Sequence, residues 1–483
     1  MKGQKLLNNL EKDWKSKRIH ILGIAGTLMG AFAVYLKQKN IEVTGSDQNI
    51  YPPMSEVLKA AQIPVYTPFS SENLEKAKPD LIIVGNVIRK VNPEMQAVLQ
   101  KDCPYQSLPQ VLESLTLPEK HSIVVAGTHG KTTTSSLLAW ILEECGENPS
   151  FFIGGVSQNF SESFRVTSTK FIVLEGDEYD TAFFDKVPKF VHYKPQDVIL
   201  TSVEYDHADI YPDMKSLIQA FDKLSDLVPA TGYFITCSEQ ETPLRIAHRS
   251  KAKIIYYGFS NTAESHAKNI ELGPHGSSFR WISKLQSSSL DLKVNLPMAG
   301  RHNILNALAC LTWIHARGLN VEKAVDALAH YKGVKRRQEV YGEISGITLI
   351  DDFAHHPTAV RETVSAIRAK YPRSRIIACF EPRSATSRRK VFQSAYTESF
   401  DGADFVYIAK PYDQSMIDVH DQFSTEELIA SLIQNRKKAK LLITSSHGIK
   451  EFSNELKSGD VVLVMSNGSF DGLLPKLSKA LSH

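Results

Sequence analysis

The stretch IVVAGTHGKTT, residues 123–133, decides the fold of this 483-residue chain. A run of apolar residues typical of a buried strand meets a glycine-rich turn, and a helix-forming stretch follows to about Glu144. Glycines let the backbone curl so that N–H groups converge on phosphate oxygens, and the helix start adds a favourable dipole. This order predicts a phosphate-binding loop in which Lys131 reaches the β- and γ-phosphates and Thr132 faces Mg²⁺.

The loop departs from the usual pattern in one respect. The first glycine of the standard motif would fall where Val125 stands, so the arch between the two glycines is shorter than usual. The alternative is a glycine turn before a helix that binds no ligand. We favour the phosphate loop because strand, Gly-Lys-Thr and helix occur in the required order.

Outward from this loop, short β-branched runs alternate with amphipathic stretches in both directions. Such alternation predicts βαβ units and parallel sheets, so the expected fold class is α/β. The chain is also longer than one hydrophobic core usually serves. We expect three domains: a Rossmann-like N-terminal domain over residues 1–118, a central P-loop ATPase domain with a mixed sheet over 119–332, and a Rossmann-like C-terminal domain over 333–483.

A second glycine turn follows the first strand candidate of the chain. Gly23, Gly26 and Gly30 precede a helix-like stretch, and Asp47 stands at the end of the next strand candidate. The glycines are spaced one residue too widely, twice, for the dinucleotide motif G-x-G-x-x-G. A structural turn without ligand and a site for an anionic group such as a diphosphate therefore both remain open.

Acidic residues gather after two strand candidates of the central block. Glu175 and Asp177 stand in the stretch EGDEYD, and Asp206 and His207 stand in DHAD. Hard oxygen ligands at the carboxyl ends of strands suit Mg²⁺ bound to phosphates. Helix caps and solvated loop acids explain the same residues equally well.

Three further polar stretches contain candidate site residues. In GRHNILNA, Asn303 and Asn306 could bind an adenine edge, although the residues alone favour helix capping. In DDFAHHPT and FEPRSATSRR, Asp351 and Arg383 follow successive strand candidates. Arginine binds carboxylates and phosphates through two parallel hydrogen bonds, so we favour a functional role over an ordinary charged surface.

The composition excludes several classes of protein. A net charge of +3 is too small to indicate nucleic acid or membrane binding, and the five widely spaced cysteines show neither a disulfide framework nor a zinc motif. No apolar run reaches the length of a membrane span, and the basic N-terminal stretch lacks the apolar segment of a signal peptide. We therefore expect a cytoplasmic protein. Composition does not reveal its oligomeric state, for which we expect a monomer or a weak homo-oligomer.

Taken in order, GTHGKTT, EGDEYD, DHAD, GRHNILNA and DDFAHHPT resemble the Mur ligases of peptidoglycan synthesis over nearly the whole chain. The short phosphate loop with Thr-His before Gly130 is similar to that family's own variant. The resemblance implies an ATP- and Mg²⁺-dependent ligase that activates a carboxylate as an acyl phosphate and joins it to an amine. The rival interpretations are a nucleotide-binding regulatory protein without turnover and a dehydrogenase.

Further stretches narrow the substrates that the resemblance implies. YPPMS, IVGN, EYDTAFFDK with KFVHY, FEPRS and MSNGSFDG are similar to the family member that joins UDP-N-acetylmuramate to the recycled tripeptide L-Ala-γ-D-Glu-meso-diaminopimelate. The alternative is the member that uses free L-alanine as its acceptor. We expect no carbamylated lysine, because the chain resembles the subgroup that lacks this group.

The resemblance also implies roles for individual residues. The UDP-sugar would be bound by Gly26, Thr27, Leu28, Met29, Asp47 and Asn86. ATP would be bound by Gly127, Thr128, His129, Gly130, Lys131, Thr132, Thr133, His302, Asn303, Asn306, Arg336 and Asp351. Mg²⁺ would be bound by Thr132, Glu175 and His207, and the peptide by His355, Arg383 and Ser384. The expected catalytic residues are Lys131, His207 and His355, with either histidine as acceptor of the amine proton.

Overall fold

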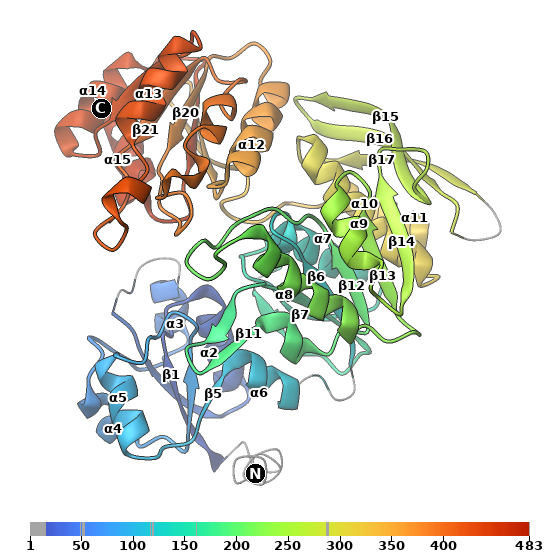
Figure 1. The fold of residues 1–483 in the computed structure, drawn as a ribbon, viewed down its shortest axis with the longest axis vertical. Helices are drawn as coiled ribbons and strands as arrows, with labels where there is room; N and C mark the ends of the chain where they lie inside the picture. The colour runs from blue at the N-terminus through green and yellow to red at the C-terminus, as the bar shows by residue number, and fades with distance from the viewer. Residues whose placement is uncertain are drawn as a thin grey trace. The chain divides into compact units, whose positions relative to one another are not determined.

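The computed structural model describes residues 16–48, 50, 54–115, 117, 120–160, 162–285 and 289–482 (Figure 1). Most of the basic N-terminal stretch and part of YPPMS lie outside these residues. The chain divides into two compact units. The first consists of Met1–Val203, Lys215–Tyr257 and Thr312–Ala324, and the second of Glu204–Met214, Gly258–Leu311 and Val325–His483.

The N-terminal part of the first unit is a parallel sheet with strand order β3-β2-β1-β4-β5. Its central strands are almost wholly buried, as expected for a parallel sheet covered on both faces. The strands are β1 (Arg18–Leu22), β2 (Glu42–Ser46), β3 (Val65–Tyr66), β4 (Leu81–Val84) and β5 (Tyr105–Ser107). The helices are α2 (Thr27–Gln38), α3 (Met54–Ala60), α4 (Ser71–Ala77), α5 (Pro93–Gln100) and α6 (Leu108–Leu115).

A second sheet of the first unit carries the phosphate loop. Its strands in this unit follow the order β14-β13-β12-β6-β9-β7-β8, and all pairs are parallel except β7 with β8. They are β6 (His121–Ala126), β7 (Ser150–Phe152), β8 (Phe164–Arg165), β9 (Phe171–Gly176), β12 (Asp197–Leu200), β13 (Tyr233–Cys237) and β14 (Lys253–Gly258). The helices of the central part of the chain are α7 (Lys131–Glu144), α8 (Met214–Leu227), α9 (Glu241–Ala247), α10 (Arg301–Ala316) and α11 (Val321–Ala329).

A short hairpin interrupts the chain after β9. It consists of β10 (Asp180–Ala182) and β11 (Asp185–Pro188), which pair antiparallel, and the 3₁₀ helix η2 (Lys189–Tyr193) follows directly. Phe183 and Phe184 at the hairpin turn pack against the core cluster of the N-terminal sheet that includes Leu22 and Val84. The hairpin therefore fastens the chain after β9 to the N-terminal sheet.

The second unit contains an antiparallel meander and a second doubly wound sheet. The meander is β15 (Ser265–Gly273), β16 (Gly276–Ser283) and β17 (Leu290–Leu296). The sheet has the order β18-β19-β23-β20-β21-β22, and only β18 runs antiparallel to its neighbour. Apolar clusters cover both of its faces, so its central strands are buried.

The strands of this C-terminal sheet are β18 (Glu339–Ile344), β19 (Ile347–Asp352), β20 (Ile376–Phe380), β21 (Phe405–Ala409), β22 (Lys438–Leu442) and β23 (Val461–Met465). Its helices are α12 (Pro357–Lys370), α13 (Thr425–Gln434), α14 (Ser446–Glu455) and α15 (Leu473–Leu481), with short 3₁₀ turns η3 (Lys390–Phe392), η4 (Ala395–Glu398), η5 (Val419–Asp421) and η6 (Phe470–Gly472). Helix α12 begins with a proline in its first turn, and the His356 ring caps it by accepting from the Thr358 N–H.

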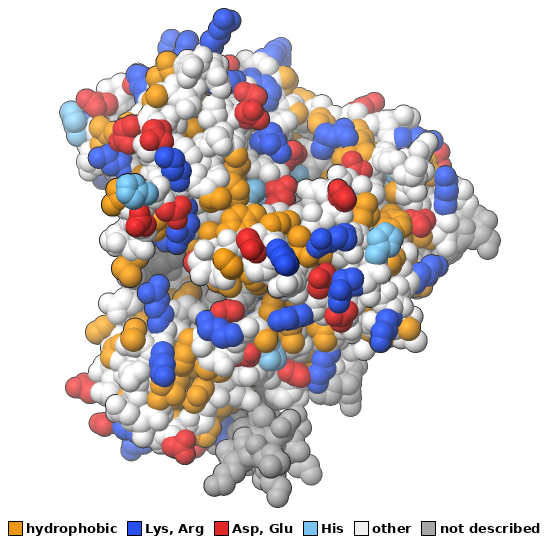
Figure 2. All heavy atoms as spheres, in the orientation of Figure 1, with side chains coloured by type: hydrophobic (Ala, Val, Ile, Leu, Met, Phe, Trp, Pro, Cys, Tyr) orange, Lys and Arg blue, Asp and Glu red, His pale blue; other side chains and the backbone are white. Residues whose placement is uncertain are grey.

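These sheets confirm the predicted α/β class, with Rossmann-like sheets toward both ends of the chain and a mixed central sheet. The domain limits 1–118, 119–332 and 333–483 stay predictions. All five cysteines are free thiols. Among the described residues, none of the helices combines the length and the apolar character that crossing a bilayer requires. Basic and acidic side chains are interspersed on the face shown in Figure 2, in keeping with the small net charge.

Candidate active site

The predicted phosphate loop lies between β6 and α7. Gly127 has φ +132° and Gly130 has φ +83°, both in the region that favours glycine. A Cβ atom on Gly127 would lie 2.3 Å from the Thr201 hydroxyl and 2.7 Å from the Ser202 carbonyl oxygen. The first glycine of the loop is therefore required by its backbone conformation and by the close approach of β12's end.

Lys131, the first residue of α7, is bound by groups of its own loop and of the turn after β9. Its ammonium donates to the Gly127 carbonyl at 2.6 Å and to the Glu178 carboxylate at 2.9 Å. Burial opposes its charge, but Glu178 and Asp177 raise the pKa of Lys131 above its ordinary value. The lysine is therefore charged at neutral pH, as binding of phosphate requires.

Thr132 and Glu175 form the next contact of the site. The Thr132 hydroxyl donates to Glu175 Oε1 at 2.7 Å, and the Gly154 N–H donates to Oε2 at 2.6 Å. Both side chains are buried. Burial and the neighbouring Asp177 raise the pKa of Glu175. Two hard oxygen donors thus lie side by side, one in the first turn of α7 and the other near the carboxyl end of β9.

A second ammonium, that of the buried Lys189, contacts the turn after β9. Lys189 donates to Asp177 Oδ2 at 2.9 Å and to the Tyr179 hydroxyl at 3.1 Å. The Tyr179 hydroxyl donates to the same carboxylate oxygen at 2.7 Å, so the three groups form a closed triangle. Burial opposes ionisation, but Lys189 and Lys131 lower the pKa of Asp177.

The N-terminal glycine turn lies at the carboxyl ends of β1 and β2. Gly23 has φ +82°, and its N–H donates to the Ser46 carbonyl at 2.8 Å. The Asp47 carboxylate accepts from the Ala25 N–H at 2.9 Å and so fixes the turn before α2. This aspartate therefore has a structural partner in addition to any ligand.

The residues expected to bind the UDP-sugar differ in exposure. Gly26 and Asn86 are exposed, Thr27 and Leu28 are half-buried, and Met29 is buried. The Met29 side chain lies close to Gly26 and Gly85, where it packs under the turn. The exposed and half-buried residues are the ones whose side chains or backbone a ligand can reach.

In the second unit, the DHAD segment contacts the loop before α12. His207 has φ +55°, and its N–H donates to Asp206 Oδ1 at 2.7 Å. His355 Nε2 lies 3.7 Å from Asp206 Oδ2, and His356 lies 3.5 Å from Glu204. Burial opposes ionisation, but His355 holds the pKa of Asp206 well below its ordinary range. A carboxylate–imidazole pair is therefore present beside His207.

The start of α10 holds the three residues expected near adenine. The Asn303 amide donates to the Ala299 carbonyl at 2.8 Å, and the Asn306 amide donates to Asn303 Oδ1 at 3.3 Å. Both asparagines are buried. His302 lies 3.7 Å from the Glu362 carboxylate. The amide groups therefore make local hydrogen bonds, but neither of these two bonds is a helix cap, because in neither does a side-chain oxygen accept from a backbone N–H.

Arg336 and Asp351 meet in the C-terminal sheet. Arg336 Nε donates to Asp351 Oδ2 at 3.1 Å, and Nη2 donates to the Ser466 and Gly468 carbonyls at 2.7 and 2.6 Å. Burial raises the pKa of Asp351 to about 6, although Arg336 acts in the opposite direction. The strand end thus carries a carboxylate that is costly to ionise.

Arg383 and Ser384 follow β20 in the same unit. Arg383 donates to Glu381 at 3.2 Å and lies over the Tyr412 ring at 3.8 Å. Ser384 donates to the Ser387 hydroxyl at 2.9 Å. One arginine of the predicted peptide site is therefore held by a carboxylate and an aromatic face.

Lys189 and Tyr179 were not identified as site residues from the sequence. Both belong to stretches that carry the family resemblance, EYDTAFFDK and KFVHY, but a lysine nine residues beyond Asp180, the end of EGDEYD, carries no local signal. Their association depends on the hairpin, which brings the start of η2 back to the end of β9. Only the fold places the second ammonium in the site.

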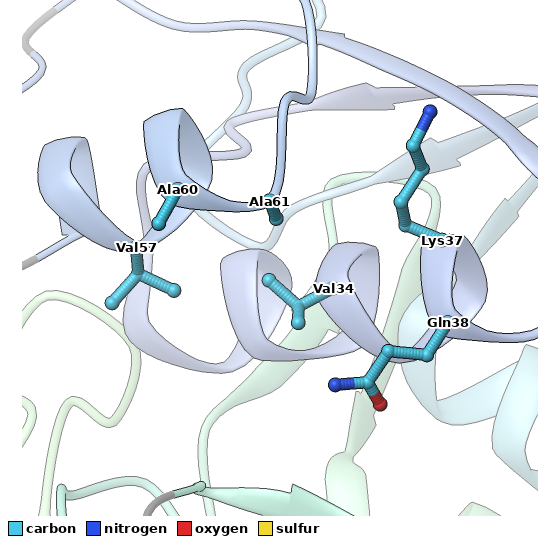
Figure 3. A pocket seen from close by; sticks show the side chains of 6 residues that line it. All are labelled: Val34, Lys37, Gln38, Val57, Ala60 and Ala61. Carbon is cyan, nitrogen blue, oxygen red and sulfur yellow. The ribbon is translucent and has the colours of Figure 1, made fainter.

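A shallow apolar depression of about 420 Å³ lies elsewhere, between α2 and α3. Val34 faces residues of α3 across the space between the two helices (Figure 3). The depression is lined by Val34, Lys37, Gln38, Val57, Ala60 and Ala61. Its residues come from the later half of α2, whereas the glycine turn lies at the start of that helix. It is therefore separate from the predicted UDP-sugar site.

Three family profiles match successive parts of the chain. The Mur ligase catalytic domain matches residues 18–119, the Mur ligase middle domain matches 125–314, and the glutamate ligase domain of Mur ligases matches 336–468. The chain belongs to the Mur ligase family, and its fold is the three-domain fold of that family. It is accordingly an ATP-dependent ligase that forms a carbon–nitrogen bond.

Within this family, the chain is similar over nearly its whole length to ligases that use UDP-N-acetylmuramate. The chain is 37% identical over 469 residues to the UDP-N-acetylmuramate–L-alanyl-gamma-D-glutamyl-meso-2,6-diaminoheptandioate ligase of Escherichia coli (strain K12), covering 96% of this chain and 98% of the relative. It is 31% identical to the UDP-N-acetylmuramate–L-alanine ligase of Endomicrobium trichonymphae, covering 94% and 96%. The murein peptide ligase of Psychrobacter arcticus 273-4 superposes with a TM-score of 0.75 at 33% identity, covering 97% and 99%.

Proposed function

We propose that the chain joins the lactyl carboxylate of UDP-N-acetylmuramate to the amine of L-Ala-γ-D-Glu-meso-diaminopimelate, with cleavage of ATP to ADP and phosphate. The names of its relatives at 36–37% identity support these substrates. The observation that carries the proposal is the phosphate loop, whose charged lysine is only 11% exposed and lies beside Thr132 and the carboxylates after β9. This site supplies what phosphoryl transfer needs.

The first step forms an acyl phosphate. A carboxylate oxygen of the sugar attacks the γ-phosphorus, the bond to the β-phosphate oxygen breaks, and ADP leaves. Lys131 offsets the negative charge that spreads over the phosphoryl oxygens, because such reactions depend mainly on positioning and electrostatics. To do so, its ammonium exchanges Glu178 for phosphate oxygens, a move of one side chain within the loop.

Thr132 and Glu175 would hold a magnesium ion. Their oxygens are hard donors that already lie in contact, 2.7 Å apart, and oxygen donors of this kind suit Mg²⁺. A bound Mg²⁺ would neutralise charge on the phosphates. His207 keeps the role of a third ligand that the family resemblance implies.

In the second step the peptide amine attacks the acyl carbon and phosphate leaves with one oxygen of the original carboxylate. A base must take the amine proton. His355 is the candidate that the geometry supports best, because its Nε2 lies 3.7 Å from the Asp206 carboxylate, which can orient the ring. His207 is the other candidate, and Arg383 and Ser384 are proposed to bind the peptide.

The proposal includes the cytoplasmic location expected from the sequence, because ATP and a nucleotide sugar are its substrates. The oligomeric state, monomer or weak homo-oligomer, also stays a prediction. The remaining ligand contacts, Gly26 to Met29, Asp47 and Asn86 for the UDP-sugar and His302, Asn303, Asn306, Arg336 and Asp351 for ATP, are part of the same proposal.

A comparison of acceptors tests the function. Phosphate release is measured with ATP, Mg²⁺ and UDP-N-acetylmuramate, and either the tripeptide or L-alanine is added. We expect release with the tripeptide and little with L-alanine, and we expect none from Lys131→Met. Release with L-alanine and none with the tripeptide would identify the alternative, an L-alanine-adding ligase.

A further inference from the structure

The turn after β9 contains more buried charge than the phosphate loop alone explains. Glu175, Asp177 and Glu178 are all buried, and two ammonium groups face them. Lys131 is the lysine of the phosphate loop, whereas Lys189 donates its hydrogen bonds to Asp177 and Tyr179, outside that loop. A buried ammonium is costly unless it is paired, so its position requires an explanation.

Lys189 is held more rigidly than a surface lysine. Its side chain is only 10% exposed. It donates to Asp177 and Tyr179 and lies 4.4 Å above the centre of the Tyr179 ring. The tyrosine in turn donates to Asp177, which fixes the carboxylate from two directions.

Asp177 lies in the field of both lysines, so the two ammonium groups share one carboxylate electrostatically. Lys189 donates its hydrogen bond to Asp177, whereas Lys131 donates to Glu178. If Lys189 lost its charge, Asp177 would keep Lys131 as a neighbouring cation. Lys131 would then be drawn toward Asp177 and away from a phosphate.

We propose that Lys189 is a positioning residue that holds Asp177 away from Lys131, so that the phosphate-loop lysine has to give up Glu178 but not Asp177 when it binds the nucleotide. This inference rests on the proposed function of Lys131 but assigns a separate task to a residue outside the loop. Lys189 acts through Asp177 and is not itself assigned a contact with ATP. Its charge also brings the carboxylates of the turn closer to neutrality, which favours binding of an anion.

The hairpin sets the position of this ammonium. Lys189 follows β11 directly, and Phe184 at the hairpin turn packs edge-on against Tyr105 of β5 at 4.9 Å between ring centres. His192, three residues later, bridges Asp185 of the hairpin and Glu113 of α6 at 2.7 and 3.0 Å. The N-terminal sheet thus fixes the segment that delivers Lys189 to the turn.

Two binding measurements on Lys189→Met separate this charge effect from a structural one. ATP binding is measured by calorimetry without divalent cations in EDTA, and Mg²⁺ binding is measured without nucleotide. We expect ATP to bind on the order of tenfold more weakly, because Lys131 is diverted and the site is more negative. We expect Mg²⁺ to bind several-fold more tightly for the same reason. Weaker binding of both ATP and Mg²⁺, or unchanged binding of both, would overturn the proposal.

Lys186→Met is the matched control. Lys186 belongs to the same hairpin and pairs with Asp180 at 2.7 Å, but its side chain is 66% exposed. Both affinities of this variant should equal those of the wild type. Lys189→Arg keeps the charge and should stay within a few-fold of the wild type in both measurements.

A double variant keeps the proposal testable if Lys189→Met does not fold. Asp177→Asn with Lys189→Met removes both charges and leaves no unpaired buried ion of this pair. Because the competing carboxylate is gone, ATP affinity in EDTA should return to within a few-fold of the wild type. If the folded double variant binds ATP as weakly as Lys131→Met does, Lys189 has another role. Normal ATP binding by the wild type without ligase activity toward any acceptor would instead count against the proposed function.

Discussion

At the scale of single residues, Gly127 shows how the backbone determines the phosphate loop. Its φ is +132°, and the Thr201 hydroxyl lies 2.3 Å from the position that a Cβ atom would occupy, so there is no room for a side chain. The same approach brings β12's end against the loop, where the Ser202 carbonyl accepts from the Thr128 N–H at 2.8 Å. The loop is therefore preformed by contacts that do not involve a ligand.

Gly127→Ala should destabilise the fold and impair nucleotide binding. The left-handed backbone and the clash together should cost about 2–4 kcal/mol in the free energy of unfolding. Gly146→Ala is the control, because Gly146 has φ +87° but no atom within 4 Å of a Cβ position; it should cost about 1 kcal/mol and leave ATP affinity unchanged. Denaturant unfolding and calorimetry measure the two effects. If both variants lose the same free energy of unfolding and bind ATP equally well, the steric argument is refuted.

Asp351 is expected to make stability depend on pH. Its pKa is about 6 in the folded chain against an ordinary value of 3.8, so the folded state resists its ionisation. This cost is absent below pH 3.8, grows up to about pH 6 and is complete above it. Asp351→Asn should therefore raise stability without nucleotide by about 2–3 kcal/mol at pH 8, with less gain at pH 5.

The melting temperatures of this variant and the wild type across pH 5–8 test that prediction. Asp401→Asn is the control, because the Asp401 side chain in the same unit is 74% exposed; it should show no comparable gain. A gain from Asp351→Asn that is the same at every pH would contradict the expected origin of the effect.

The sequence identified some of the site residues but not others. Lys131 and Thr132 occupy a strand–turn–helix context that the local pattern identifies, and the structure shows that context. The sequence left the role of Asn303 and Asn306 open, because a helix start suits capping as well as ligand binding. In the structure both amides make local hydrogen bonds. Lys189 could not be identified as a site residue from the sequence, since its partner Asp177 is twelve residues away and their contact depends on tertiary structure.

At the scale of elements, the hairpin β10–β11 with η2 connects the phosphate-loop sheet to the N-terminal sheet. His192 of η2 lies between Glu113 and Asp185. Burial favours its neutral ring, but the hydrogen bond to Glu113 and the charge of Asp185 raise the pKa of His192 above its ordinary value. The protonated ring therefore fastens the hairpin more strongly than the neutral ring does.

His192→Asn should destabilise the chain more at pH 6 than at pH 8.5. A raised pKa means that the stabilisation is fully present below about pH 6.5 and is lost as pH rises through the folded value. The difference should be on the order of 1 kcal/mol. Thermal unfolding at the two pH values measures it, with His447→Asn as the control because that side chain is 84% exposed. A larger loss at pH 8.5 would contradict the assigned charge state.

The pattern of the sequence predicted long elements better than this short hairpin. Strands such as β6, β9 and β23 contain continuous apolar runs, as expected for a buried parallel sheet. Strands β10 and β11 have three and four residues, several of them charged, and periodicity cannot identify them. The aromatic pair at the turn is explained only by its packing on the N-terminal sheet.

At the scale of the whole molecule, the alternation of strands and helices predicted the α/β class and the mixed central sheet. It did not predict how the chain divides into compact units, because that division depends on contacts between segments far apart in the sequence. The DHAD segment is the clearest example. It follows a strand of the first unit yet belongs to the second, where Asp206 faces His355.

An oxygen-transfer experiment tests the central claim most directly. UDP-N-acetylmuramate labelled with ¹⁸O in its lactyl carboxylate is converted with ATP, Mg²⁺ and the tripeptide, and the released phosphate is analysed by mass spectrometry. An acyl phosphate intermediate predicts that each phosphate formed carries one oxygen from the labelled carboxylate. Amide formation accompanied by unlabelled phosphate would contradict the account, since the carboxylate would then never have been bonded to the γ-phosphorus.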